Sequence, residues 1–313
     1  MTDILVLGGA HIDRRGRISG ETAPGASNPG MWKEEAGGGA FNCARSLSRL
    51  GHRVTLISPR GGDSEGDAVA SAAEAAGIID RPFTFLDRRT PTYTAIMERD
   101  GNLVIALADM DLYRFFSPKR LAVRQVRDQF DEAAFVLTDA NLPAETLAAL
   151  TKAAAERNLP VAAIGISPAK VVRFMELLDR LDYLFTNEAE ARALTGQSPA
   201  DHRAWPAIMR AAGLKGGAIT RGSREIVAWD EASQASLLPP PLEVIGDVTG
   251  AGDGFAAGFL HARLEGGTLG DGIVHGAASA RLALASEMAT AEDLTRDLLM
   301  STLPLVPSAE IVL

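Results

Sequence analysis

The segment most suggestive of chemistry in this 313-residue chain is Asp247-Val248-Thr249-Gly250-Ala251-Gly252-Asp253, which leads into a helical pattern over Phe255–Arg263. Glycines expose backbone N–H groups, and the start of a helix carries the positive end of its dipole, so a phosphate can bind there. An acid beside that phosphate could take a proton from an incoming hydroxyl, an arrangement that suits phosphoryl transfer. The alternative is a glycine-rich turn in which Asp253 only caps the helix.

A second glycine-rich stretch, Gly37–Asn42, precedes the first long helical pattern. Small residues there would let a substrate approach the backbone, and the Asn42 amide offers both a donor and an acceptor to a hydroxyl. Asp13 follows the first predicted strand and could accept hydrogen bonds from two vicinal hydroxyls of a ribose or sugar ring. The alternatives are a turn with Asn42 as the helix N-cap and a surface turn for Asp13.

Two later stretches could meet a nucleotide and its metal ion. Asn187-Glu188-Ala189-Glu190 follows the predicted strand that begins at Tyr183, and its oxygens could order the water shell of Mg²⁺. The alternative is an Asn N-cap followed by acids that the helix dipole favours in the first helical turn. Thr220-Arg221-Gly222 ends another strand and could border phosphates or ribose, or form a simple turn.

Composition and missing motifs exclude several classes of protein. The net charge of −9 argues against a nucleic-acid-binding surface, and the single cysteine, Cys43, excludes an internal disulfide framework. The five histidines show no metal-ligand spacing, and neither a P-loop nor a G-x-G-x-x-G fingerprint is present. The first residues do not resemble a signal peptide, and no apolar run is long enough to span a membrane. We therefore expect a cytoplasmic protein that binds neither nucleic-acid polymers nor membranes.

Strand-like and helical patterns alternate along most of the chain, which predicts an α/β fold with a mainly parallel central sheet and helices on both faces. The strand-like runs are Ile4–Leu7, Val54–Ser58, Phe135–Thr138, Val161–Ile164, Tyr183–Phe185 and Ala218–Thr220. The helical patterns are Asn42–Leu50, Gly66–Ala76, Ala144–Arg157, Ala169–Leu178, Glu188–Leu194, His202–Ala212 and Phe255–Arg263. Ligands of such sheets gather at the carboxyl ends of the strands.

Two regions interrupt this alternation. Arg14–Glu35 is rich in Gly, Ser, Pro and charge, and Thr92–Ala108 reads as two strands joined by Arg99-Asp100-Gly101, a hairpin signal. We expect them to form a small β lid, with segments at about 14–35 and 92–111, on a single domain that spans 1–313.

The order of these motifs resembles the PfkB (ribokinase-like) family of carbohydrate and nucleoside kinases, from Ile4 to about Glu287. The resemblance implies the same fold, a homodimer, and ATP with Mg²⁺ as cofactors. It makes Asp253 the general base and gives the N–H groups of Gly250, Ala251 and Gly252 the role of anion hole.

The resemblance also assigns the remaining motif residues. Asp13, Gly38 and Asn42 would hold the sugar, while Asn187, Thr220 and Gly222 would border ATP. Asn187 and Glu190 would position Mg²⁺ through water. Asp247 and Thr249 lie where some members bind a monovalent cation such as K⁺.

Finer features are similar to the pseudouridine kinase branch, which implies phosphorylation of the pseudouridine 5′-hydroxyl. They include Gly9–Asp13, Ser27–Gly30, Ala108–Asp111 and Asp139–Asn141, with Asn141 and Lys170 near the substrate. The chain departs from that branch at His11, at Phe41 and at Ile164–Ser167, which lacks an Asp-Pro pair. A kinase for ribose, another sugar or another nucleoside, or a catalytically silent relative that binds a nucleoside or sugar, therefore stays open.

Overall fold

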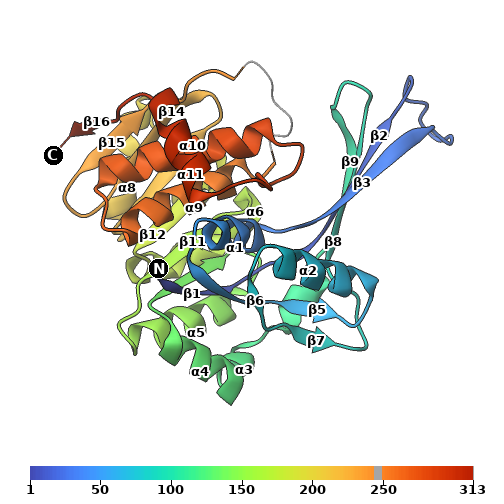
Figure 1. Ribbon diagram of the computed structural model, residues 1–313, viewed down its shortest axis with the longest axis horizontal. Coiled ribbons are helices and arrows are strands. Elements are labelled where there is room, and N and C mark those ends of the chain that lie inside the picture. Colours follow the sequence, from blue (N-terminus) through green and yellow to red (C-terminus); the bar gives the residue numbers. More distant parts are fainter. Residues whose placement is uncertain (243–248, 313) are drawn as a thin grey trace.

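A ten-stranded sheet forms the centre of the computed structural model, which describes residues 1–242 and 249–312 (Figure 1). Its strands lie in the order β16-β15-β14-β13-β12-β11-β10-β1-β4-β6. The parallel strands are β1 (Asp3–Leu7), β4 (Arg53–Ile57), β6 (Ile79–Asp80), β10 (Phe135–Asp139), β11 (Val161–Ile164), β12 (Tyr183–Asn187) and β13 (Gly217–Arg221). The antiparallel extension consists of β14 (Arg224–Trp229), β15 (Gln234–Leu237) and β16 (Glu310–Val312). The predicted mainly parallel sheet is thus confirmed.

Helices cover both faces of this sheet because alternate residues of each strand point to opposite sides. In β1, Ile4 and Val6 pack into one hydrophobic core and Leu5 and Leu7 into another. The first core is covered by α1 (Gly39–Arg49), α2 (Ser64–Ala75), α9 (Ala251–Leu264), α10 (Leu269–Ala285) and α11 (Arg296–Thr302). The second is covered by α3 (Pro118–Leu121), α4 (Arg124–Glu132), α5 (Ala144–Ala155), α6 (Pro168–Val171), α7 (Glu188–Thr195) and α8 (Trp205–Ala211).

Short 3₁₀ helices complete the body of the molecule. They are η1 (Asp111–Phe115), η2 (Val172–Arg180), η3 (His202–Ala204) and η4 (Leu303–Leu305). Among the described residues, no helix combines the length and the apolar character needed to cross a bilayer.

A second sheet projects from the body and brings together the two segments that interrupt the α/β alternation (Figure 1). We call it the lid sheet; its strands are β2 (His11–Ile18), β3 (Gly30–Gly37), β8 (Thr92–Met97) and β9 (Leu103–Asp109), in the order β3-β2-β8-β9. Parallel pairing of β2 with β8 joins the two segments. The hairpin predicted at Arg99-Asp100-Gly101 is confirmed, and Gly101 takes the positive φ of 94° that this turn requires. A separate two-stranded sheet pairs β5 (Pro59–Gly61) with β7 (Phe83–Phe85).

Some element boundaries differ from the sequence prediction. The first helix begins at Gly39 rather than at Asn42, because a glycine run that looks like a loop here enters a buried helix start. The predicted helix Ala169–Leu178 is α6 followed by the 3₁₀ helix η2, and the predicted helix His202–Ala212 begins as η3. The alternation also did not reveal α10 or the antiparallel strands β14 to β16.

Candidate active site

The start of α9 is built around Gly250, the N-cap residue, which has a φ of 76°. A side chain there would clash with the carbonyl of Ala289, so the position accepts only glycine. The first N–H groups of a helix lack intrahelical partners, and here they belong to the turn that contains Ala251 and Gly252. Asp253 is the third helical residue, and its carboxylate accepts a hydrogen bond from the Asn42 amide of α1 at 2.8 Å. Its side chain is therefore directed to a neighbouring helix, so the capping interpretation of Asp253 is wrong.

Arg45 determines how the Asn42 amide is oriented. Its Nη2 donates to Asn42 Oδ1 at 2.6 Å, and because a guanidinium has only donors, the Asn42 Nδ2 must face Asp253. Burial lowers the pKa of Arg45 to about 10, with repulsion from Arg49 next and attraction to Glu35 opposing it, so Arg45 stays charged. Asn42 lies inside α1, whose N-cap is Gly38, so the alternative interpretation of Asn42 as the N-cap is wrong. Sequence reasoning missed Arg45, although its i,i+3 spacing from Asn42 is a recognisable signal.

The surroundings of Asp253 favour its protonated form. Burial raises the pKa of this carboxyl to about 7, the hydrogen bond from Asn42 opposes that rise, and the negative charges of Asp139, Glu190 and Asp13 add to it. The side chain nevertheless keeps a partly exposed surface. A carboxylate that titrates near neutral pH and can be reached from solvent is suited to act as a general base.

Asp139, at the end of β10, organises the carboxyl edge of the sheet. This fully buried carboxylate accepts the N–H groups of Gly9 at 3.1 Å, Ala40 at 3.0 Å and Asn141 at 2.9 Å. The same carboxylate accepts the Asn141 side-chain amide at 2.8 Å, and Lys170 Nζ donates to Asn141 Oδ1 at 2.6 Å. Asn141 and Lys170 are thus in contact, whereas from the sequence only the family resemblance placed both of them near the substrate. Asp139 was quoted only as part of the Asp139–Asn141 motif and was given no role of its own, although an acid at a strand's carboxyl end is the signal for one.

Asp13 lies in β2 with only 7% of its surface exposed, so the surface-turn alternative is wrong. Its Oδ1 is 3.3 Å from His11 Nε2, and His11 Nδ1 is 2.9 Å from the Tyr113 hydroxyl. Gly38 has a φ of 110°, and a Cβ there would lie 2.5 Å from the Gly9 carbonyl oxygen. Only glycine therefore fits at position 38, beside the His11 side chain.

Tyr113, the partner of His11, comes from η1 and could not be found from local sequence.

Asn187 and Glu190 form a complete capping box at the start of α7. Asn187 Oδ1 accepts the Glu190 N–H, and Glu190 accepts both the N–H and the side-chain amide of Asn187, each at 2.9 Å. The capping interpretation is therefore correct for these residues. Burial raises the pKa of Glu190 to about 7, which the hydrogen bonds from Asn187 oppose. Glu190 is one of the charges that act on Asp253, so both acids lie at the same edge.

The remaining predicted nucleotide residues lie beside this box. Thr220 is the register partner of Asn187 in the pairing of β13 with β12. Gly222, with a φ of 64°, lies in the exposed turn between β13 and β14. Of the predicted monovalent-cation pair, Thr249 directly precedes Gly250, and Asp247 lies outside the described residues.

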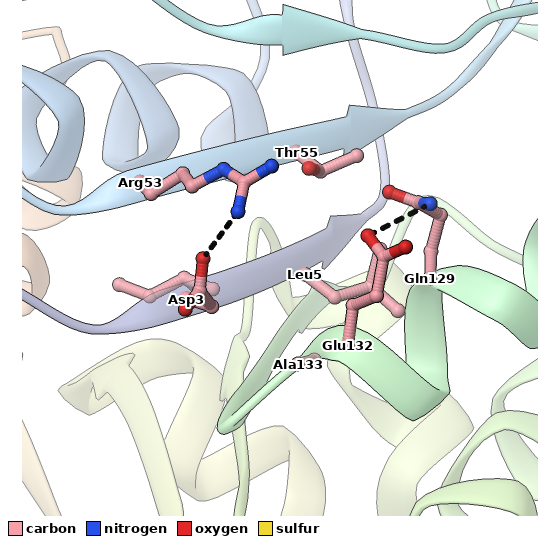
Figure 2. Close-up of a pocket in the computed structure, with 8 residues that line it drawn as sticks. Asp3, Leu5, Arg53, Thr55, Gln129, Glu132 and Ala133 are labelled. Atoms are coloured by element: carbon pink, nitrogen blue, oxygen red, sulfur yellow. Dashed lines mark hydrogen bonds and ion pairs between the residues drawn. The ribbon is translucent and has the colours of Figure 1, made fainter.

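A small surface pocket lies at the opposite, amino-terminal edge of the sheet (Figure 2). Its polar chains pair with one another: Arg53 lies 3.3 Å from Asp3, and Gln129 donates to Glu132 at 3.4 Å. The lining consists of Asp3, Ile4, Leu5, Arg53, Thr55, Gln129, Glu132 and Ala133. It shares no residue with the carboxyl-edge cluster, which holds the buried acids and the glycine turn.

Comparison with known proteins agrees with this geometry. The model of the pfkB family carbohydrate kinases matches residues 1–296. The chain is 26% identical to the pseudouridine kinase of Escherichia coli (strain K12), over 98% of this chain and 97% of that protein. It is 58% identical to a solved carbohydrate kinase from Agrobacterium tumefaciens, which covers 100% of both chains with a TM-score of 0.90.

A more distant structure has the same fold. It is the Arabidopsis thaliana ribokinase complexed with ribose and ATP, with 21% identity, a TM-score of 0.83, and 96% and 98% of the two chains covered. The resemblance stated from the motifs is confirmed, and the chain belongs to the pfkB family of carbohydrate kinases, which are phosphotransferases.

Proposed function

We propose that this chain transfers the terminal phosphoryl group of ATP to the 5′-hydroxyl of a nucleoside, with pseudouridine as the acceptor. The observation that carries the proposal is the placement of Asp253 in the first turn of the glycine-capped helix α9, held by Asn42. Among curated relatives, the pseudouridine kinase aligned over nearly the whole chain supports this acceptor. The ribokinase with bound ribose and ATP supports ATP as the donor on the basis of fold.

In this reaction Asp253 would take the proton of the acceptor hydroxyl while the oxygen of that hydroxyl bonds to the γ-phosphorus of ATP. The bond from that phosphorus to the bridging oxygen breaks, and ADP leaves. The N–H groups of Gly250, Ala251 and Gly252 would stabilise the charge on the transferred group. Apart from its chain neighbours and the backbone of its own helix, no atom in the described part of the chain lies within 4 Å of a Cβ built on Gly252, so the turn has room for a phosphate.

The donor set beside the turn fits a magnesium ion bound through water. Glu190 and Asn187 lie at the same edge as Asp253; their oxygens already bond within the capping box, and the remaining lone pairs of these oxygens would accept the waters that Mg²⁺ usually keeps. When bound, the ion would neutralise phosphate charge. Asn187, Thr220 and Gly222 would border the nucleotide, and Thr249 with Asp247 would hold a monovalent cation.

The acceptor would lie under the lid sheet. Asp13 would accept hydrogen bonds from the ribose hydroxyls, and Asn42 would offer them the second N–H of the side-chain amide that already donates to Asp253, with Gly38 at the start of the same helix. Asn141 with Lys170 would contact the base, because this linked pair is anchored to Asp139 at the same edge. A simple sugar is the alternative acceptor, favoured by the 58% identity to a protein described as a carbohydrate kinase.

Release of ADP with a panel of acceptors tests the proposal. Pseudouridine, uridine, adenosine, ribose and fructose are each supplied with ATP and Mg²⁺, and we expect turnover to be fastest with pseudouridine. If only ribose or fructose is turned over, the assignment of pseudouridine as the acceptor is rejected, whereas the assignment of kinase activity stands. Absence of turnover with every acceptor would favour a binding protein.

We also propose that the lid sheet joins two copies of the chain into a homodimer. Its edge strand β9 exposes Leu103, Ile105 and Leu107 by 59%, 65% and 70%. Exposed apolar edge strands tend to pair with another chain. Sedimentation should show a dimer that Ile105→Glu weakens; a monomeric wild-type protein would reject the assignment.

A further inference from the structure

Glu35 is a buried carboxylate in lid strand β3 that bonds outside its own sheet. Only 6% of the residue is exposed, and acidic side chains are seldom buried so deeply unless they are paired. Glu35 Oε1 lies 3.0 Å from Arg15 Nη2 of β2. The second oxygen, Oε2, accepts the backbone N–H of Ala289 at 3.1 Å, across 254 residues of sequence. One side chain thus connects the lid sheet to the chain that follows α10.

The backbone of Ala289 in turn contacts the helix start that holds Asp253. The carbonyl of Ala289 lies so close to Gly250 that a Cβ on Gly250 would clash with it. Gly250 is the N-cap of α9, and its positive φ sets the direction of the following N–H groups. Residue Ala289 therefore lies between the Glu35 carboxylate, which accepts its N–H, and the proposed anion-binding turn, which its carbonyl contacts.

Two further contacts hold this peptide segment in place. Lys33, also in β3, donates to the Glu287 carbonyl. From α1, Arg49 Nη1 donates to the Ala291 carbonyl at 2.9 Å. The segment is thus held by the lid on one side and by α1 on the other. Small shifts of β3 would be transmitted to Gly250, because closely packed backbone has little room to adjust.

The position of Glu35 in the lid sheet links this contact to the acceptor side. Asp13, proposed above to bind the acceptor, is the direct register partner of Glu35 in the antiparallel pairing of β2 with β3. Cross-strand partners move together because the ladder fixes their spacing. An acceptor held by Asp13 would therefore restrain Glu35, and Glu35 would restrain Ala289 and Gly250.

We infer that Glu35 is a positioning residue that couples the acceptor-binding lid to the anion-binding turn of α9. The inference rests on the proposed function, because it needs an acceptor at Asp13 and a phosphate at Gly250–Gly252. It requires that acceptor and nucleotide each strengthen the binding of the other, since coupling between two sites is reciprocal.

The test measures that mutual strengthening without turnover. The dissociation constant of pseudouridine is determined with and without the β,γ-imido analogue of ATP and Mg²⁺. In the wild type we expect the nucleotide to tighten acceptor binding by at least about fivefold. In Glu35→Ala this ratio should fall close to one and kcat should fall at least about tenfold, while acceptor binding without nucleotide changes by less than about threefold.

Two matched variants make the result specific. Glu35→Gln keeps an oxygen for the Ala289 N–H but loses the charge that faces Arg15, and it should retain part of the coupling. Glu34→Ala removes the adjacent, exposed carboxylate that pairs with Arg14 at 3.1 Å, and it should keep the full ratio.

Each outcome separates the inference from the proposed function. If the nucleotide tightens acceptor binding as much in Glu35→Ala as in the wild type, the role of Glu35 is overturned, even if pseudouridine is phosphorylated normally. If the wild type binds pseudouridine but does not phosphorylate it, the proposed function fails, and the binding ratio still decides whether Glu35 couples the sites. If pseudouridine does not bind, the acceptor that turns over in the panel replaces it. If Glu35→Ala does not fold, the comparison of Glu35→Gln with Glu34→Ala decides, and equal ratios would overturn the inference.

Discussion

Asp253 and Glu190 occupy the same position in two different helices, yet they have different partners. Each is the third residue of its helix, after the N-cap residues Gly250 and Asn187. In both, burial raises the carboxyl pKa to about 7. Glu190 bonds back to the N-cap of its own helix, whereas Asp253 accepts a hydrogen bond from Asn42 on another helix.

The type of N-cap residue explains the difference. The Asn187 side-chain oxygen accepts the Glu190 N–H, and the Glu190 carboxylate accepts the Asn187 N–H in return. The two residues thus satisfy each other, and only 5% of Glu190 is exposed. Gly250 has no side chain to take part in such a box. The acid three residues later is then available to a partner from elsewhere in the fold and to substrate. With glycine as the N-cap, the acid at the third helical position is therefore free to act as a base instead of capping its own helix.

Replacing the acid of the glycine-capped helix should have the largest effect. Asp253→Asn keeps the shape and the contact with α1 but removes the base, so kcat should fall about 10²- to 10⁴-fold with KM changed only a few-fold. Steady-state ADP release measures both constants, and circular dichroism verifies the fold. Turnover near the wild-type rate would remove Asp253 from the role of base and erase the contrast with Glu190.

The pH dependence of the wild type should show the same acid. Because the base acts only when ionised and its pKa is raised to about 7, kcat/KM should fall about tenfold for each pH unit below 7. The loss occurs on the acid side, since lower pH protonates Asp253. The profile is measured by initial rates from pH 5 to 9. A flat profile between pH 5 and 7 would contradict this prediction.

Loss of Arg45 should shift the acid limb of the pH profile, the fall in kcat/KM at low pH, to higher pH. In Arg45→Met the Asn42 amide is no longer held with its NH₂ toward Asp253, so ionised Asp253 loses support and its pKa rises. We expect the limb to move up by about one pH unit, which is about a tenfold loss at pH 6. Arg53→Met, at the opposite edge of the sheet, serves as the control and should leave the limb in place. An unmoved limb in Arg45→Met would show that Asn42 is oriented by other contacts.

The smallest effect is expected at the capping box. Glu190→Gln can still accept the Asn187 N–H but loses the hydrogen bond from the Asn187 side-chain amide, so its unfolding free energy in urea titrations should fall by less than in Glu190→Ala, which should lose about 1 kcal/mol. If Glu190 also orders the waters of Mg²⁺, Glu190→Gln should raise the Mg²⁺ concentration for half-maximal activity several-fold. Unchanged Mg²⁺ dependence would leave Glu190 with a structural role alone.

Local sequence predicted those features that depend on short-range chemistry. The Asp100-Gly101 turn, the alternating strands and helices, and the glycine-rich start of α9 all follow from residues close together in the chain. The capping box at Asn187 was likewise foreseen, because its two members lie three residues apart. Element ends were less accurate where glycine runs, as at Gly38, enter a helix directly.

Residue types and their spacing alone determined the α/β class and the presence of an acid beside a glycine turn. Which partners those residues meet was decided only by the tertiary structure. Asn42 reaches Asp253 across 211 residues, Asp139 binds the Gly9 N–H across 130, and Glu35 reaches Ala289 across 254. The reason is physical: capping and turn formation act within a few residues, whereas burial and long-range hydrogen bonds exist only once the sheet brings its strand ends together.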